Sequence, residues 1–232
     1  MKKLEKKNMI LIIITAAVVL TIIFALMGKD VNDTVSVNNI EKTKTITLDA
    51  GRELEVTNIG SYSGPYMEDA SGEPVSKVMM IQVTNNGDED VQYAEITLSG
   101  EGEEDAVFKF STLKAGETMT VLESTQKKYK KSADYTQALA SNVAYFQKKL
   151  KTYPKKLEIQ ALDGGLNVTN ISGEDIDGEI VIYFKDCDGD MLMGGITYRG
   201  RIEGGLKAGE IRQLMSGNFT KENTKVIFID II

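Results

Sequence analysis

The chain has 232 residues, with 27 Lys and Arg against 34 Asp and Glu, so its formal net charge at pH 7 is −7. A chain this acidic has no general affinity for nucleic acid, and none is expected. Histidine is absent and Cys187 is the single cysteine, which excludes Ser-His and Cys-His catalytic pairs and an intrachain disulfide. No catalytic residue, cofactor or metal site is predicted.

An uncharged run of nineteen residues, from Met9 to Met27, is the first predicted element. As a helix with a rise of about 1.5 Å per residue it would span roughly 28 Å, close to the hydrocarbon thickness of a bilayer. The eight residues before it contain four lysines and one glutamate, and lysine-rich flanks stay on the cytoplasmic side. The pattern predicts a cytoplasmic tail at 1–8, a transmembrane helix at 9–28, and a single-pass cell-membrane protein whose later residues are extracellular.

A cleaved signal peptide is the alternative interpretation of this run, because a lysine-rich start suits it as well. The apolar region of a signal peptide usually has about 7–15 residues, whereas this run is longer and no small-x-small cleavage site follows it. We therefore predict an uncleaved signal anchor, followed by a polar linker at 29–43. Either interpretation leaves the rest of the chain outside the cytoplasm, where 23 basic residues stand against 33 acidic ones.

Two stretches of the remaining chain resemble each other. Val-Thr-Asn at 83–85 is followed by a polar turn and later by Leu-Lys-Ala-Gly-Glu at 113–117. Val-Thr-Asn at 168–170 is followed in the same order by the same pentapeptide at 206–210. The interval is eight residues longer in the second stretch, and we expect a longer hairpin there to absorb the difference. One type of domain is therefore predicted twice.

Each copy has the residue pattern of β-strands. Met79, Ile81 and Val83 share one face of a predicted strand, and Ile180 and Ile182 begin another, because side chains alternate with a period of two. Turns that contain Gly and Asn separate these short strands. The fold class is predicted as mainly β. After the transmembrane helix come two immunoglobulin-like β-sandwich domains, at 44–123 and 157–232.

The order of Val-Thr-Asn, polar turn, strand, Leu-Lys-Ala-Gly-Glu and strand resembles extracytoplasmic β-sandwich modules of Gram-positive bacteria grouped as FxLYD-type domains. Their closing turn is matched at 113–117 and 206–210. Their name motif is matched in part by Ile-Tyr-Phe-Lys-Asp at 182–186, which keeps the final Asp and lacks the Leu-Tyr. The resemblance covers 44–123 and 157–232. It implies surface modules and carries over no catalytic residue.

A lysine-rich stretch at 124–156 belongs to neither copy and holds nine lysines against one aspartate. Apolar residues at 135, 139, 143, 146 and 150 fall on one helical face, and Ser132 can cap it. This favours a short helix between the domains. The rival interpretation makes 142–146 the last strand of the first domain, equivalent to 224–228.

The same stretch is the predicted binding region, for a protein partner, an anionic cell-wall polymer or the outer lipid head groups. A solvated connector attracted to its two acidic neighbours is the alternative, because charge runs are usually solvated. The candidate binding residues are Lys127, Lys128, Lys130, Lys131, Lys148, Lys149 and Lys151.

Asp186, Asp188 and Asp190 are the candidate ligands of a calcium loop. An EF-type loop also needs a glycine at its sixth position and a glutamate at its twelfth, and neither residue is present there. A hairpin turn built on Asp188 and Gly189 explains the segment without a metal. Cys187 is expected to be accessible in this turn.

The expected function is non-catalytic binding, assembly or adhesion at the bacterial cell surface, with an accessory subunit of an envelope complex as one form of that role. Rigid sandwiches present loops and strand edges to partners. The alternative is a cell-envelope hydrolase that uses Asp or Glu carboxylates.

Overall fold

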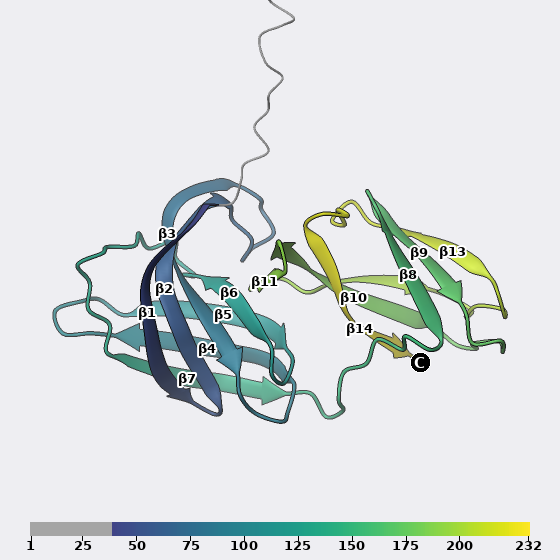
Figure 1. The fold of residues 1–232 in the computed structure, drawn as a ribbon, viewed down its shortest axis with the longest axis horizontal. Coiled ribbons are helices and arrows are strands. Elements are labelled where there is room, and N and C mark those ends of the chain that lie inside the picture. Colours follow the sequence, from purple (N-terminus) through teal and green to yellow (C-terminus); the bar gives the residue numbers. More distant parts are fainter. Residues whose placement is uncertain (1–38) are drawn as a thin grey trace, which may run out of the picture. The chain divides into compact units, whose positions relative to one another are not determined.

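Fourteen strands and no helix make up the regular structure of residues 39–232, the part of the chain that the computed structural model describes (Figure 1). The prediction of a mainly β fold is confirmed. The predicted tail and transmembrane helix, at 1–28, lie outside the described residues. Within residues 39–232, no helix is long and apolar enough to cross a membrane.

The largest sheet has the order β1-β2-β3-β6-β11-β10-β12, and β14 also pairs with β10. Its strands are β1 (Asn39–Gly51), β2 (Leu54–Pro65), β3 (Pro74–Asn85), β6 (Thr118–Leu122), β10 (Ile180–Asp188), β11 (Met191–Met193), β12 (Tyr198–Ile202) and β14 (Thr224–Ile231). Two further sheets have the orders β5-β4-β7 and β13-β9-β8. Their strands are β4 (Val91–Ser99), β5 (Ala106–Leu113), β7 (Gln137–Tyr145), β8 (Leu157–Leu162), β9 (Gly165–Asn170) and β13 (Ile211–Met215).

The strand pairings of residues 39–145, here the first half, recur in residues 157–232, the second half. The set β2-β3-β6 has its counterpart in β8-β9-β13, and β7-β4-β5 has its counterpart in β14-β10-β12. Every pairing within these sets is antiparallel. The sequence repeat is therefore matched by a repeat in topology. β1 and β11 have no counterpart in the other half.

The apolar strand faces that the alternation of residues predicts are buried in the structure. Met79, Ile81 and Val83 of β3 belong to the core of the first half, together with residues of β2, β4, β5 and β6. Val78 and Met80, which flank Met79 and face the other way, are buried too, in a smaller cluster. β3 is thus covered on both faces.

β10 is likewise covered on both faces. Ile180, Ile182 and Phe184 lie in the core of the second half. Tyr183 points the other way and packs against the core of the first half, beside Phe228 of β14. A single strand of the second half therefore contributes to both cores.

The repeated Asn of each Val-Thr-Asn joins two turns of its half. The Asn170 side chain, which is fully buried, donates hydrogen bonds to the carbonyls of Glu174 (2.7 Å), Leu206 (3.0 Å) and Lys207 (3.1 Å). Its own carbonyl oxygen accepts the N–H of Ser172 at 3.0 Å. One amide group thus closes the polar turn and fastens it to the Leu-Lys-Ala-Gly-Glu turn.

Asn85 makes the equivalent bonds in the first half. Its side chain donates to the carbonyls of Glu89 (2.8 Å) and Leu113 (3.3 Å) and accepts from the N–H of Gly87 at 3.0 Å. Val-Thr-Asn and Leu-Lys-Ala-Gly-Glu recur together because they contact each other directly. The main-chain groups of each turn need the other segment, or the asparagine that joins them, to complete their hydrogen bonds.

The predicted helix in the stretch 124–156 is wrong. The rival strand at 142–146 is confirmed for 142–145, the end of the longer strand β7. β7 pairs along the free edge of β4, with Ile96 opposite Ala140 and Leu98 opposite Ala138. Both alanines pack against the core of the first half, while Leu139 between them is 65% exposed. An open sheet edge offers β7 a full set of hydrogen bonds, which outweighs the helical spacing of its few apolar residues.

The eight extra residues of the second copy form the longer hairpin that the spacing predicts. β10 and β11 are joined by Gly189 and Asp190, since Asp188 pairs with Met191. Gly189 has φ 58°, as such tight turns require. The expectation that Cys187 is accessible is wrong, because this residue lies within β10 and its side chain is buried.

Replacement of the bridging amide should destabilise the fold. Asn170→Ala leaves three carbonyls without their donor, and Asn85→Ala leaves two. Each of these variants should lower the free energy of unfolding by about 1–3 kcal/mol. Urea denaturation of residues 39–232 measures this. Asn167→Ala on β9, whose side-chain amide donates to the exposed Gln160 side chain, is the matched control and should change stability by less than about 0.5 kcal/mol. Equal effects at Asn167 and Asn170 would contradict the bridging role.

Candidate functional site

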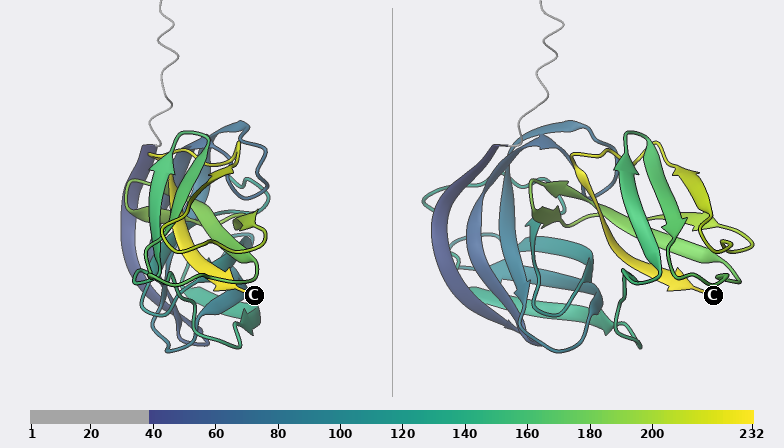
Figure 2. Two further views of the ribbon diagram at one scale, coloured as in Figure 1. Left: turned by 90° about the vertical axis from the view of Figure 1, so that its right-hand side faces the viewer. Right: turned by 45° about the vertical axis from the view of Figure 1, so that its right-hand side comes forward.

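The hairpin of β10 and β11 brings the second half against the first (Figure 2). β11 pairs in parallel with β6, with Leu192 opposite Met119 and Met193 opposite Thr120. The N–H of Gly194 continues this ladder with a 2.6 Å hydrogen bond to the carbonyl of Thr120. The insertion that distinguishes the second copy is therefore the segment that attaches it to the first.

A buried lysine reinforces this attachment. Lys185 of β10 is fully buried, and its ammonium donates to the carbonyls of Ser111 (3.0 Å) in the first half and Gly195 (2.9 Å) in the second. Burial lowers its pKa to about 8, against the opposing attraction of Glu68 and Asp186. A charge placed so deep favours an arrangement that keeps both carbonyls beside it, because each lost hydrogen bond leaves the charge less well compensated.

A carboxylate from the loop after β2 completes the contact. Glu68 accepts the N–H of Leu122 at 2.7 Å and that of Gly195 at 2.6 Å. Burial raises the pKa of this carboxyl to about 7, although these two bonds and the nearby Lys185 act in the other direction. Gly195 has φ 53°, and a Cβ there would lie 2.2 Å from the carbonyl oxygen of Met67, so only glycine fits.

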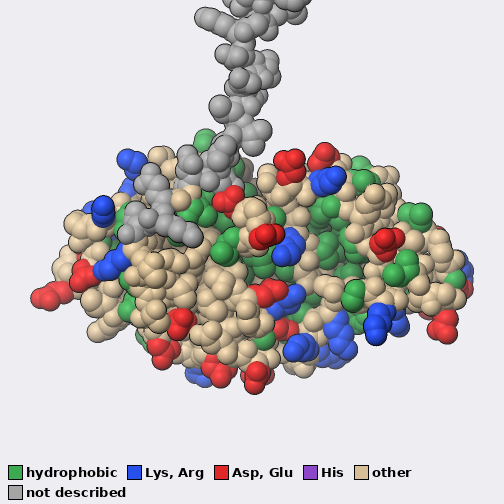
Figure 3. All heavy atoms as spheres, in the orientation of Figure 1, with side chains coloured by type: hydrophobic (Ala, Val, Ile, Leu, Met, Phe, Trp, Pro, Cys, Tyr) green, Lys and Arg blue, Asp and Glu red, His purple; other side chains and the backbone are tan. Residues whose placement is uncertain are grey.

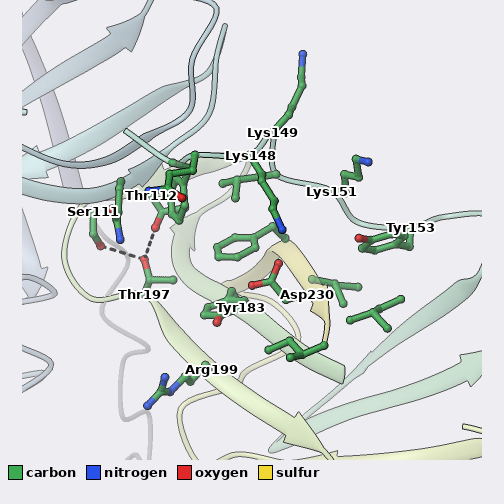
Figure 4. Close-up of a pocket in the computed structure, with 18 residues that line it drawn as sticks. Ser111, Thr112, Lys148, Lys149, Lys151, Tyr153, Tyr183, Thr197, Arg199 and Asp230 are labelled. Carbon is green, nitrogen blue, oxygen red and sulfur yellow. Dashed lines mark hydrogen bonds between the residues drawn. The ribbon is translucent and has the colours of Figure 1, made fainter. Parts of the chain in front are cut away.

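Beside this attachment lies an open cleft of about 1060 Å³ (Figure 4). Its walls come from β5, β10, β12, β14 and residues 146–156, here the connector. Part of its lining is aromatic. The rings of Tyr183 and Phe228 stack with centroids 4.0 Å apart, and Phe146 meets Phe228 edge-on at 5.6 Å.

Four cationic side chains and one carboxylate side chain line this cleft: Lys148, Lys149, Lys151, Arg199 and Asp230. Lys148 points into the cleft toward Asp230, whereas the side chains of Lys149 and Lys151 extend outward (Figure 4). In the space-filling view, Lys and Arg side chains gather along the lower margin, where the connector runs (Figure 3). We call this cleft with its charges the cationic cleft.

The repeat positions the connector. Asp90, the residue immediately before β4, accepts the N–H of Ala115 from the Leu-Lys-Ala-Gly-Glu turn at 2.9 Å. Its second oxygen accepts the N–H of Leu150 at 2.7 Å, and its carbonyl accepts that of Phe146 at 2.9 Å. Asp175 makes the equivalent turn bond, to Ala208 at 3.0 Å. These hydrogen bonds fix the main chain of the connector and therefore the positions from which its lysine side chains extend.

The structure brings together three of the seven lysines predicted to bind. The other four precede β7, and none of them lines the cationic cleft. Lys127 donates to the carbonyls of Glu104 and Asp105 and lies over the ring of Tyr135. Lys128 donates to the carbonyl of Ser76 at 2.7 Å. Lys130 and Lys131 are exposed.

The three aspartates considered for calcium lie along the hairpin of β10 and β11. Asp186 is inside β10 and burial raises its pKa, while Asp188 and Asp190 stand at the turn. Among residues 39–232, no three Asp, Glu or Cys side chains come together as a group that could hold a metal ion.

A second cleft of about 820 Å³ contains the carboxyl groups of Glu68 and Asp69, with Tyr66, Tyr93 and Lys109 nearby. Both oxygens of Glu68 already accept main-chain N–H groups. Hydrogen bonds from Ser71 lower the pKa of the exposed Asp69. Glu68 is thus placed to position two segments, which differs from the role of a proton donor to a substrate.

Sequence reasoning missed Glu68 and Lys185. One signal was present, namely a lysine inside the apolar strand that begins at Ile180. No protein-family model, curated protein or solved structure matches this chain. The resemblance to FxLYD-type domains stays a prediction from the residues.

Neutralising Glu68 should change how stability depends on pH. The pKa of Glu68 in the folded protein is about 7, above the ordinary 4.5. Its contribution to the free energy of unfolding is therefore fully present below pH 4.5 and is lost as the pH rises through 7. Relative to Glu68→Gln, the wild-type free energy of unfolding should fall by about 1–3 kcal/mol between pH 4.5 and 7.5. Urea denaturation at both pH values measures the difference.

Asp69→Asn is the control for this pH dependence. Because the pKa of Asp69 is lowered from 3.8, its contribution changes only below that value, outside the measured range. A constant difference between wild type and Glu68→Gln across the range would show that Glu68 is not desolvated in the folded protein.

Proposed function

We propose that this chain is a membrane-anchored, extracytoplasmic binding or assembly protein of the bacterial cell surface. In this proposal, Met9 to Met27 form the anchor. The two halves are immunoglobulin-like sandwich modules of the kind that the FxLYD resemblance implies. The cationic cleft is the ligand site. The function is non-catalytic, and an accessory subunit of an envelope complex is one form of it.

The charge of the cationic cleft is the observation that most directly supports a binding role. Four cationic side chains meet a single carboxylate side chain there, in a protein whose overall charge is −7. The local excess is thus opposite to the average, and a concave site with one sign of charge concentrates ligands of the other sign. We infer an anionic ligand.

The walls of the cleft add a second requirement. Tyr183, Phe228 and Phe146 present aromatic surface beside the lysines, and Leu150 between Lys149 and Lys151 is half-buried. Each exposed ion pair contributes only about 0.2–1 kcal/mol. A ligand that makes several such pairs and also covers apolar surface suits the cleft better than a small ion does.

A cell-envelope hydrolase remains the second candidate. Its chemistry needs two carboxyl groups that face one substrate. The cationic cleft offers only Asp230. In the second cleft, both Glu68 oxygens are engaged by the main chain. The binding role therefore ranks first.

Removal of the cleft lysines should reduce partner recovery. Lys148→Gln, Lys149→Gln and Lys151→Gln in one chain should lower the amount of crosslinked partner or wall polymer recovered from native membranes about tenfold, at roughly 0.5 kcal/mol per lost pair. The control variant combines Lys130→Gln, Lys131→Gln and Lys156→Gln. It removes the same charge at exposed positions outside the cleft. Equal recovery with both variants would exclude the cleft as the site.

The anchor is tested separately by membrane fractionation. The full chain should stay in the membrane pellet after an alkaline carbonate wash, because a helix of this length buries its apolar surface in the bilayer. A chain that lacks residues 1–28 should be released. External protease should degrade residues 39–232 in intact cells stripped of their wall. Release of the full chain without detergent would contradict the anchor.

A further inference from the structure

The last strand of the second half has one edge that faces the cationic cleft. In an antiparallel ladder, successive residues direct their main-chain groups to opposite sides. Glu179 and Ile232 exchange two hydrogen bonds of 2.9 Å. Asp230, two residues earlier, therefore also bonds toward β10. The main-chain groups of Ile229 and Ile231 point to the other edge of β14.

This outer edge is partly occupied. The N–H of Ile229 donates to the carbonyl of Lys151 in the connector at 2.7 Å. Farther back, the Lys114 ammonium reaches the carbonyl of Ile227 at 3.4 Å. Within residues 39–232, no further hydrogen bond reaches the carbonyl of Ile229 or the N–H and carbonyl of Ile231. The connector thus begins a line of bonds that stops beside the open cleft.

Three free main-chain groups in a row are a template for another strand. Lysines on an edge strand can protect it from such pairing. Here the cleft lysines belong to the facing connector and not to β14. They surround the free edge with positive charge and leave its hydrogen-bonding groups open.

We propose that β14 takes an extended acidic segment of a protein partner as an added strand, with Lys148, Lys149, Lys151 and Arg199 as the charge complement. This inference rests on the proposed function and names its partner class. The added main chain would bond Ile231 and the Ile229 carbonyl. Alternate side chains of the added strand would face the cleft beside Phe228 and Asp230, where acidic residues meet the lysines.

A peptide fits these groups better than a phosphate polymer does. The free edge offers one N–H donor and two carbonyl acceptors, and a main chain supplies partners for both kinds. Ionised phosphate groups only accept hydrogen bonds, so inorganic polyphosphate would leave the Ile229 and Ile231 carbonyls unpaired. The polymer would pair with the lysines and, on the strand edge, with the Ile231 N–H alone.

The test uses the full chain in detergent and a fluorescent peptide of about ten residues that alternates aspartate with valine. Ile231→Pro removes the N–H on the free edge and should weaken peptide binding about tenfold. Ile231→Ala removes the same partly buried side chain, keeps the N–H, and should stay within about twofold of wild type. Circular dichroism checks that both variants fold. In wild type, amide exchange at Ile231 should slow when the peptide binds.

Three outcomes would overturn strand addition. If the peptide fails to bind, or binds without protecting the Ile231 amide, the edge is not the site. A second outcome is that inorganic polyphosphate binds to wild type and that only the triple variant Lys148→Gln, Lys149→Gln, Lys151→Gln loses this binding. If Ile231→Pro then has no effect on the binding of either ligand, the cleft is an anionic-polymer site and the proposed function survives. If the triple variant changes no binding at all, both proposals fall.

Discussion

The structure of residues 39–232 depends on a buried ammonium group. Lys185 is fully buried, and its bonds to the carbonyls of Ser111 and Gly195 tie the two halves together. Desolvating such a charge costs several kcal/mol unless its hydrogen bonds are complete. Glu68 holds the same segment from the other side, through the N–H of Gly195. The contact therefore specifies one arrangement of the halves, and the cationic cleft, with walls from both, follows from it.

A duplicated topology becomes asymmetric through one insertion. In each half, an asparagine and an aspartate of the polar turn fasten the Leu-Lys-Ala-Gly-Glu turn. The first half places Asp90 so that it also holds the connector. The second half adds β11, which pairs with β6. Local repeats thus make two similar frames, and the added hairpin decides how they join.

The proposed binding role draws on both parts of this arrangement. The connector supplies the lysines, and β14 supplies a strand edge with free main-chain groups beside them. Charge concentrates an acidic ligand, and directional hydrogen bonds select its form. Lysines of the same stretch that precede β7 are bound to nearby carbonyls or lie exposed away from the cleft, so charge in the sequence alone does not define the site.

The sequence by itself determined the mainly β class, the repeat, the buried faces of β3 and β10, and the longer hairpin of the second copy. Alternation and turn residues act between neighbours in the chain, so they can be interpreted locally. Only the tertiary structure decided that Gln137–Tyr145 is a strand, because the free edge of β4 competes with helical spacing. It also decided the burial of Lys185 and Cys187 and which lysines share a cleft, since those depend on segments distant in sequence.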